Sequence, residues 1–140
     1  MTLLPINERS YGVIPLMVRE NRVCIFIVQH LSGAWLLPKG HALAGEPERQ
    51  AAERELAEET GLQIERWLDH EPFIEHYSFW RGDTRISKEA KYFPAFVTGD
   101  IHLQQSEIKA GRWESAHDAP SFVTFPEMKK IAQQVNEWLS

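Results

Sequence analysis

Three glutamates that fall close together in the chain have the residue type and spacing for metal chemistry. Glu55 lies three residues before Glu58 and four before Glu59, so a helix would place all three on one face. Like charges at these spacings repel one another and weaken a helix, and a bound cation offsets that repulsion. Carboxylate oxygens with no adjacent Cys or His suit a hard ion such as Mg²⁺ or Mn²⁺. The pattern therefore predicts metal-assisted chemistry, for which phosphate is the natural substrate.

The residues around these glutamates predict a helix with a defined start and end. A start near Glu46-Pro47 is favoured because proline suits the first helical position and acidic residues suit the first turn. Residues 49–60 are rich in Ala, Glu, Arg and Leu, which are good helix formers. Gly61 is expected to end the helix in the left-handed conformation. The small side chains of Ala51 and Ala52 are expected to leave room for ions and phosphates.

Strands are predicted on both sides of this helix. Pro15 and Pro94 interrupt two of them, and each proline indicates an edge strand or a bulge because it cannot donate to a ladder. The order of strands and helices predicts a mixed α/β (α+β) sandwich. The main predicted strands cover residues 10–18, 22–29, 73–80 and 90–97, and a final helix covers residues 125–139.

The composition is that of one globular domain spanning residues 1–140. The chain has 43% hydrophobic and 25% charged residues, and its net charge of −5 argues against long nucleic acids and anionic membranes as partners. Cys24, the only cysteine, is expected in a buried strand, and a single cysteine indicates a reducing compartment. Met1–Pro5 lacks the pattern of a signal peptide, and no apolar run approaches the roughly 18 residues of a membrane span. We therefore expect a cytoplasmic protein.

One segment of the chain resembles the Nudix box at every defining position. It includes the three glutamates described above, which we call the box glutamates. The resemblance implies a Nudix-type α/β/α sandwich with a central mixed β-sheet. It also implies that a divalent ion assists hydrolysis of a nucleoside diphosphate linked to another group. The matching positions are Gly40, Glu46, Arg54-Glu55-Leu56, Glu58-Glu59 and Gly61-Leu62.

The resemblance also implies roles for single residues. The box glutamates (Glu55, Glu58 and Glu59) would hold the ion, with the carbonyl oxygen of Gly40 as a further ligand. Arg54 would orient the carboxylates. A carboxylate beside the ion can take the proton of the attacking water. Mg²⁺ is the expected ion, with Mn²⁺ as the alternative.

Two further segments resemble the diadenosine tetraphosphate hydrolase group of this family. Residues 33–41 read Gly-x-Trp-x-Leu-Pro-Lys-Gly-His, and the resemblance implies that Lys39 and His41 face phosphates. Diphosphoinositol polyphosphate hydrolases share the Pro-Lys-Gly-His part. Residues 88–95 contain Lys, Tyr, Phe and Ala at the spacing of the same group, which adds Lys88 as a candidate substrate ligand.

A third segment adds one glutamate outside the box. Ser106-Glu107, followed by Trp113, resembles a region in which a glutamate reaches the metal site. Glu107 is therefore a candidate ligand or general base. Tyr77, Trp80 and Tyr92 are the expected stacking partners of the substrate's base, because stacking on a ring tolerates different bases.

Each of these residues also has a plainer interpretation. The acidic helix face could simply be solvated, and Lys39, His41 and Glu107 could be ordinary surface residues. Tyr77 and Trp80 could belong to the packing of the strand. The remaining histidines show no ligand spacing and receive no role; they are His30, His70, His76, His102 and His117.

Three functions compete on these features. The first is asymmetric cleavage of diadenosine tetraphosphate to ATP and AMP by attack of water on phosphorus. The second is a related pyrophosphohydrolase acting on the 5′-triphosphate end of RNA, a nucleoside triphosphate or a diphosphoinositol. The third is a non-catalytic nucleotide-binding module, against which the complete set of box glutamates argues. The base preference, the number of ions, the identity of the general base and the oligomeric state stay open.

Overall fold

Two long parallel strands form the centre of the sheet in the computed structural model, which describes residues 6–140. Shorter strands border them in antiparallel pairs, so the sheet is mixed, as expected. The expectation for Met1–Pro5 lies outside the described residues. The strands are β1 (Glu8–Arg19), β2 (Arg22–His30), β3 (Trp35–Leu36), β4 (Lys39–Gly40), β5 (Gln63–Trp67), β6 (Phe73–Arg81), β7 (Thr84–Thr98) and β8 (Ile108–Ser115). The helices are α1 (Glu48–Thr60), α2 (Ala119–Phe122) and α3 (Pro126–Leu139).

The two prolines lie where the central strands change partners. β1 pairs with β4 at Gly12 and with β2 from Leu16 onward, and Pro15 falls between these segments. On β7, Tyr92 pairs with β6 and Ala95 with β5, and Pro94 falls between them. The expectation of an edge strand or a bulge is therefore wrong for both. On the edge where each central strand changes partner, neither proline is paired with a residue of the neighbouring strand. The missing N–H group of each proline therefore costs no hydrogen bond of the sheet.

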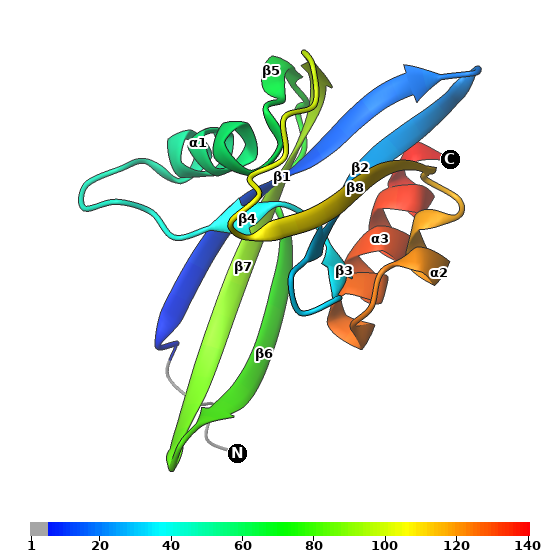
Figure 1. Cartoon of the computed structure of the whole chain (residues 1–140). Coiled ribbons are helices and arrows are strands. Elements are labelled where there is room, and N and C mark those ends of the chain that lie inside the picture. The colour runs from blue at the N-terminus through cyan, green and yellow to red at the C-terminus, as the bar shows by residue number, and fades with distance from the viewer. Residues whose placement is uncertain (1–5) are drawn as a thin grey trace.

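Helix α1 covers one face of the sheet, whereas α2 and α3 cover the other (Figure 1). Ala51, Ala52 and Leu56 of α1 have no exposed surface. On the opposite face, Met128 and Val135 of α3 are buried. This arrangement confirms the expected α/β/α sandwich. The expectation that Ala51 and Ala52 make room for ligands is wrong, because both side chains belong to the hydrophobic core.

The observed ends of α1 agree with the ends predicted from the sequence. Pro47 precedes the helix in an extended conformation, and Gly61 follows it with φ 81°. The N–H of Gly61 donates to the carbonyl of Ala57 at 2.9 Å, which satisfies one terminal carbonyl. The predicted helix is confirmed, although it begins at Glu48 and not at Glu46-Pro47. The box glutamates lie on its last two turns.

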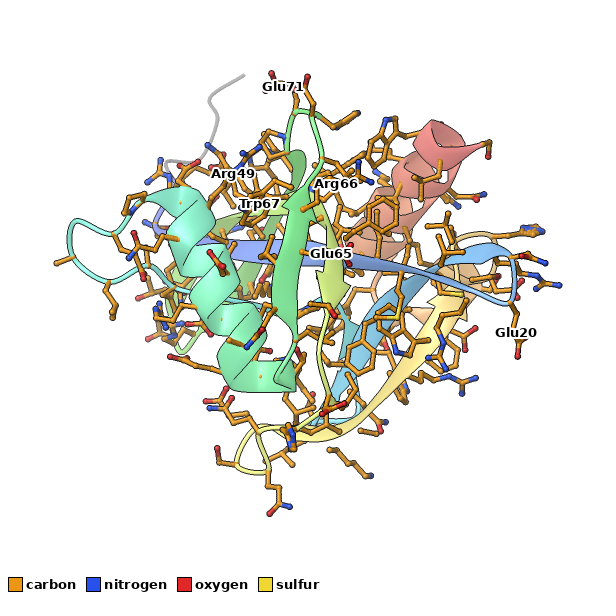
Figure 2. The ribbon with its side chains drawn as sticks, turned by 90° about the horizontal axis from the view of Figure 1, so that it is seen from above. Glu20, Arg49, Glu65, Arg66, Trp67 and Glu71 are labelled. Carbon is orange, nitrogen blue, oxygen red and sulfur yellow. The ribbon has the colours of Figure 1, made fainter. Side chains whose placement is uncertain are left out.

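Strand β5 is an element that the sequence analysis missed. Its residues are mostly polar and exposed, so the sequence shows no clear hydrophobic alternation. Trp67 at its end lies under Arg49 of α1, with the guanidinium carbon 5.1 Å from the ring centroid, and Figure 2 shows the two side chains together. The start of α1 is therefore tied to β5 by a cation–π contact. None of the helices within residues 6–140 has the length and apolar character needed to cross a bilayer.

The packing of α1 gives a first prediction. Leu56→Ala should lower the free energy of unfolding by about 2–5 kcal/mol, because it leaves a cavity between α1 and the sheet. Leu43→Ala is the matched control, since Leu43 is 62% exposed and its loss should change stability by no more than about 0.5 kcal/mol. Urea unfolding followed by circular dichroism measures both. Equal costs for the two variants would contradict the packing described here.

Candidate active site

Arg54 gathers the acidic side chains at the centre of the candidate site. Its Nη1 donates to Glu55 at 3.1 Å and to the two carboxylate oxygens of Glu58 at 3.1 and 3.2 Å. Its Nε and Nη2 donate to Glu46 at 2.9 and 3.0 Å, and Nη2 also reaches the carbonyl of His41 at 2.9 Å. These acidic partners raise the pKa of Arg54, Glu46 first. The contacts fit a residue that orients carboxylates.

Gly40 leaves the space that Glu55 occupies. A Cβ atom at position 40 would lie 2.1 Å from the carboxyl carbon of Glu55, so only glycine allows the carboxylate to sit there. Burial raises the pKa of Glu55, the charge of Arg54 opposes this shift, and Glu58 and Glu107 add to it. Strand β4 therefore brings the backbone of Gly40 directly against one box glutamate.

Glu59 is the most deeply buried box glutamate, with 2% of its surface exposed. Its Oε2 accepts the backbone N–H of Lys39 at 3.1 Å. Its Oε1 is buried and has no hydrogen-bond partner among residues 6–140. Burial and the neighbouring carboxylates of Glu55 and Glu107 raise the pKa of Glu59 to about 8. A buried carboxylate with a free oxygen is costly unless a donor or cation satisfies it.

The donor set fits a hard divalent cation, although it is not preassembled around one point. In the part of the chain that the structure describes, no three His, Cys, Asp or Glu side chains are grouped as a ready metal site. The reason is that Glu55 and Glu58 both face the guanidinium of Arg54. The free Oε1 of Glu59 and the glycine at position 40 still provide the oxygen-rich space that Mg²⁺ or Mn²⁺ requires.

Glu107 lies within electrostatic reach of the box glutamates. Its loop is tied to the end of α1, because the N–H of Gln104 donates to the carbonyl of Glu59 at 3.0 Å. The carbonyl of Glu107 accepts the N–H of Leu31 at 3.2 Å. The charge of Glu107 contributes to the raised pKa values of Glu55 and Glu59. The fold thus brings this exposed carboxylate to the site from a distant part of the sequence.

A cavity of about 520 Å³ lies next to Glu59. It is bordered by the end of β2, by β3, β4, β6 and β7, and by the start of α3. Its walls combine aromatic rings with basic and acidic groups, as small-molecule sites often do. The lining residues include His30, Lys39, Glu75, Tyr77, Phe79, Lys88 and Phe125.

Two lysines enter this cavity beside Tyr77. The Nζ of Lys39 donates to the Tyr77 hydroxyl at 3.0 Å and lies 4.0 Å from the carboxylate of Glu75. Burial lowers the pKa of Lys39, and the charges of Glu75 and Glu59 oppose that shift. The Nζ of Lys88 lies 5.9 Å from the centroid of the Tyr77 ring. Both ammonium groups are therefore available to a cavity ligand that carries phosphate.

The structure corrects two of the expected stacking residues. Tyr92 is fully buried, and its hydroxyl donates to Glu75 at 3.2 Å, so its ring cannot stack on a base. Trp80 is 66% exposed and does not line the cavity, because alternation along β6 turns it away from the face that carries Tyr77 and Phe79. Among the three expected rings, only Tyr77 faces the cavity.

His41 also lies elsewhere than expected. Its Nδ1 is 3.0 Å from the carbonyl of Arg9 at the start of β1, and the ring does not line the cavity. The residue serves the site through its backbone carbonyl, which accepts the hydrogen bond from Arg54.

Several cavity residues had no role in the sequence analysis. Glu75 and Phe79 share the face of Tyr77, so the alternation of β6 could have indicated them. His30 and Phe125 come from the ends of other elements, and no local pattern indicates them. Phe125, which is 49% exposed, adds a second accessible ring to the cavity wall.

The chain is similar in sequence to known proteins over most of its length. The NUDIX domain model matches residues 7–139. The asymmetrical bis(5′-nucleosyl)-tetraphosphatase of Rattus norvegicus is 31% identical over 107 residues, which cover 75% of this chain and 71% of that protein. The RNA pyrophosphohydrolase of Rhodopseudomonas palustris is 28% identical over 118 residues, with 72% and 69% coverage.

The chain also matches part of a longer relative and shares its fold with a solved structure. The putative mutator protein MutT4 of Mycobacterium tuberculosis is 27% identical over 113 residues, which are 74% of this chain but only 41% of that protein. A crystal structure of a C. elegans Ap4A hydrolase binary complex has a TM-score of 0.72 at 21% identity, and the match covers 94% of this chain and 96% of that chain. The structural likeness shows that the fold is shared.

The contact between Gly40 and Glu55 gives a second prediction. Gly40→Ala should push the Glu55 carboxylate away and lower hydrolysis of a nucleoside polyphosphate about 100-fold, as displacements near 1 Å can do. Gly82→Ala in the β6–β7 turn is the control: nothing lies within 4 Å of its added Cβ, and its φ of 62° makes the change strained. It should lower stability by about 1–2 kcal/mol and leave the rate unchanged. Wild-type activity in Gly40→Ala would contradict the assigned role.

Proposed function

This chain belongs to the Nudix family and is a hydrolase that acts on pyrophosphate bonds, and we propose that it cleaves dinucleoside tetraphosphates asymmetrically. The proposed substrate is diadenosine tetraphosphate, and the products are ATP and AMP. The similarity to the rat tetraphosphatase supports this assignment. The observation that carries it is a cavity lined by aromatic rings and two lysines, one of which, Lys39, donates its backbone N–H to the box glutamate Glu59.

The kinds of group that line the cavity match the parts of such a substrate. Tyr77, Phe79 and Phe125 offer ring surfaces for a base. Lys39 and Lys88 lie beside Tyr77 and offer positive charge to a phosphate chain. The Lys39 backbone then leads to Glu59, where the acidic groups begin. A nucleotide bound with its base against the rings would extend its phosphates toward the box glutamates.

The proposed reaction is a displacement at phosphorus. The oxygen of water forms a bond to one phosphorus, the bond from that phosphorus to the bridging oxygen breaks, and the bridging oxygen leaves with the other nucleotide. When bound at the acidic groups, a divalent ion supplies positive charge that offsets the charge of the phosphates and makes attack by water easier. Arg54 keeps Glu55 and Glu58 oriented throughout.

We propose that Glu107 is the general base that takes the proton of the attacking water. Within residues 6–140 its carboxylate accepts no hydrogen bond, whereas Glu55 and Glu58 accept from Arg54. Its oxygens can therefore accept the proton of the water without breaking a contact to Arg54. Its loop is tied to Glu59 through Gln104, which keeps the carboxylate near the reacting groups.

The 5′-triphosphate end of RNA is the second candidate substrate, supported by the similarity to the Rhodopseudomonas palustris enzyme. The net charge of −5 disfavours a long RNA but not contact with its first nucleotide.

The proposed location is the cytoplasm, because the single cysteine is buried and free.

Product analysis tests the proposed function. The purified protein is incubated with Mg²⁺ and diadenosine tetraphosphate, a nucleoside triphosphate or a short triphosphorylated RNA, and the products are separated by anion exchange. We expect ATP and AMP from the first substrate and little change in the other two. Pyrophosphate released from the triphosphate or the RNA, with the first substrate intact, would overturn the substrate assignment and keep the family chemistry.

A pair of variants tests the acidic groups in the same assay. Glu58→Gln should lower turnover by about 100-fold or more, since it removes a charge from the group that Arg54 orients. Glu53→Gln is the matched control, because Glu53 is an exposed residue of the same helix. Both variants should unfold at the wild-type denaturant concentration. Full activity in Glu58→Gln would show that the box glutamates are wrongly assigned.

A further inference from the structure

The imidazole of His30 carries a ring nitrogen that no described residue satisfies. Within residues 6–140, its Nε2 atom is buried without a hydrogen-bond partner, and so is Oε1 of Glu59. The two atoms lie 3.9 Å apart, which is too far for a hydrogen bond. A buried polar atom left unpaired destabilises a fold. The pair therefore indicates a place where the protein binds another group.

The backbone fixes His30 in this position. The pairing of β2 with β8 shifts its register between Gln29 and His30, and such irregularities re-aim side chains. The N–H of His30 donates to the carbonyl of Ala34 at 2.9 Å, and its carbonyl accepts the N–H of Gly33 at 2.8 Å. The direction of the ring thus follows from a tight turn and an irregular strand end.

His30 lies at the junction of the cavity and the acidic groups. It lines the cavity and also approaches Glu59. Lys39 lines the cavity too and reaches Glu59 through its backbone N–H, but its Nζ already donates to Tyr77. Of these two residues, only His30 has a buried side-chain nitrogen without a hydrogen-bond partner among residues 6–140. A phosphate chain that runs from the rings to the box glutamates passes beside it.

We propose that His30 binds the phosphate chain of the substrate through a hydrogen bond from Nε2–H to a phosphate oxygen beside the box glutamates. The tautomer with hydrogen on Nε2 supplies the donor. The inference rests on the proposed function and deepens it by naming the side chain that holds the substrate at the entrance to the acidic groups. It applies to any nucleoside polyphosphate that this enzyme cleaves.

Two substitutions of His30 separate a phosphate contact from simple packing. His30→Phe keeps an aromatic ring and removes the donor, whereas His30→Gln keeps a side-chain N–H group. His117→Phe is the control, because His117 is exposed and lies outside the cavity lining. The probe is α,β-methylene ATP, which has a carbon in place of the bridging oxygen and is not cleaved there. Calorimetry measures its Kd for each full-length variant in Mg²⁺, and a separate titration measures the Kd of Mn²⁺ alone.

The expected result is a rise of about 10- to 100-fold in the Kd of the analogue for His30→Phe, as for loss of one hydrogen bond to a charged group. His30→Gln should recover part of this loss, and His117→Phe should match the wild type. The Kd of Mn²⁺ should stay unchanged in all of them. Wild-type affinity for the analogue in His30→Phe, or equal losses in the Phe and Gln variants, would overturn the proposal. Weakened Mn²⁺ binding would overturn it as well, because His30 would then act on the ion.

Steady-state kinetics keep this test separate from the test of the substrate. KM and kcat are measured with whichever substrate of the product analysis the wild type cleaves best. A KM that rises at least tenfold in His30→Phe, with kcat changed less, supports the phosphate contact. An unchanged KM counts against it. Failure to cleave diadenosine tetraphosphate would overturn the proposed function. The role of His30 could still be tested with another substrate that the wild type cleaves.

Discussion

Repulsion among carboxylates at the end of α1 is the constraint on which the rest of the site depends. Arg54 offsets most of this repulsion, because its guanidinium nitrogens lie within 3.2 Å of carboxylate oxygens of Glu46, Glu55 and Glu58. Glu59 is left with one backbone donor and a buried free oxygen. A helix packed by buried Ala and Leu side chains can carry this excess of negative charge because the core contacts on its other face hold it in place. The unpaired oxygen of Glu59 is the feature on which the proposed cation site rests.

The short strand β4 and the end of β2 bring these acidic groups next to the cavity. Strand β4 is only two residues long, and it places Gly40 against Glu55 while the N–H of Lys39 donates to Glu59. Strand β2 ends in an irregular turn that directs His30 to the same place. The acidic helix lies on one face of the sheet and α3 on the other. The short strands between them let groups from both faces meet.

Features set by local spacing could be predicted from the sequence, and features set by distant contacts could not. The helix that carries the glutamates, its end at Gly61 and the layered fold follow from periodicity, helix formers and a strong motif. The failures share one cause. Whether Tyr92 is buried, which face of β6 is the inner one, and why Pro15 is tolerated all depend on strands that are distant in sequence. His30 showed no signal, because its position comes from a strand irregularity and a turn.

The central claim is that the acidic end of α1 is completed by a divalent cation, and thermal unfolding in Mg²⁺ tests it without any substrate. An ion that binds only the folded chain stabilises it by about 2.7 kcal/mol at a concentration 100 times its Kd. We therefore expect the Tm of the wild type to rise steadily with Mg²⁺. Glu59→Gln, which neutralises the buried carboxylate and keeps its shape, should lose that rise. Equal rises in both proteins, or no rise in the wild type, would contradict the account.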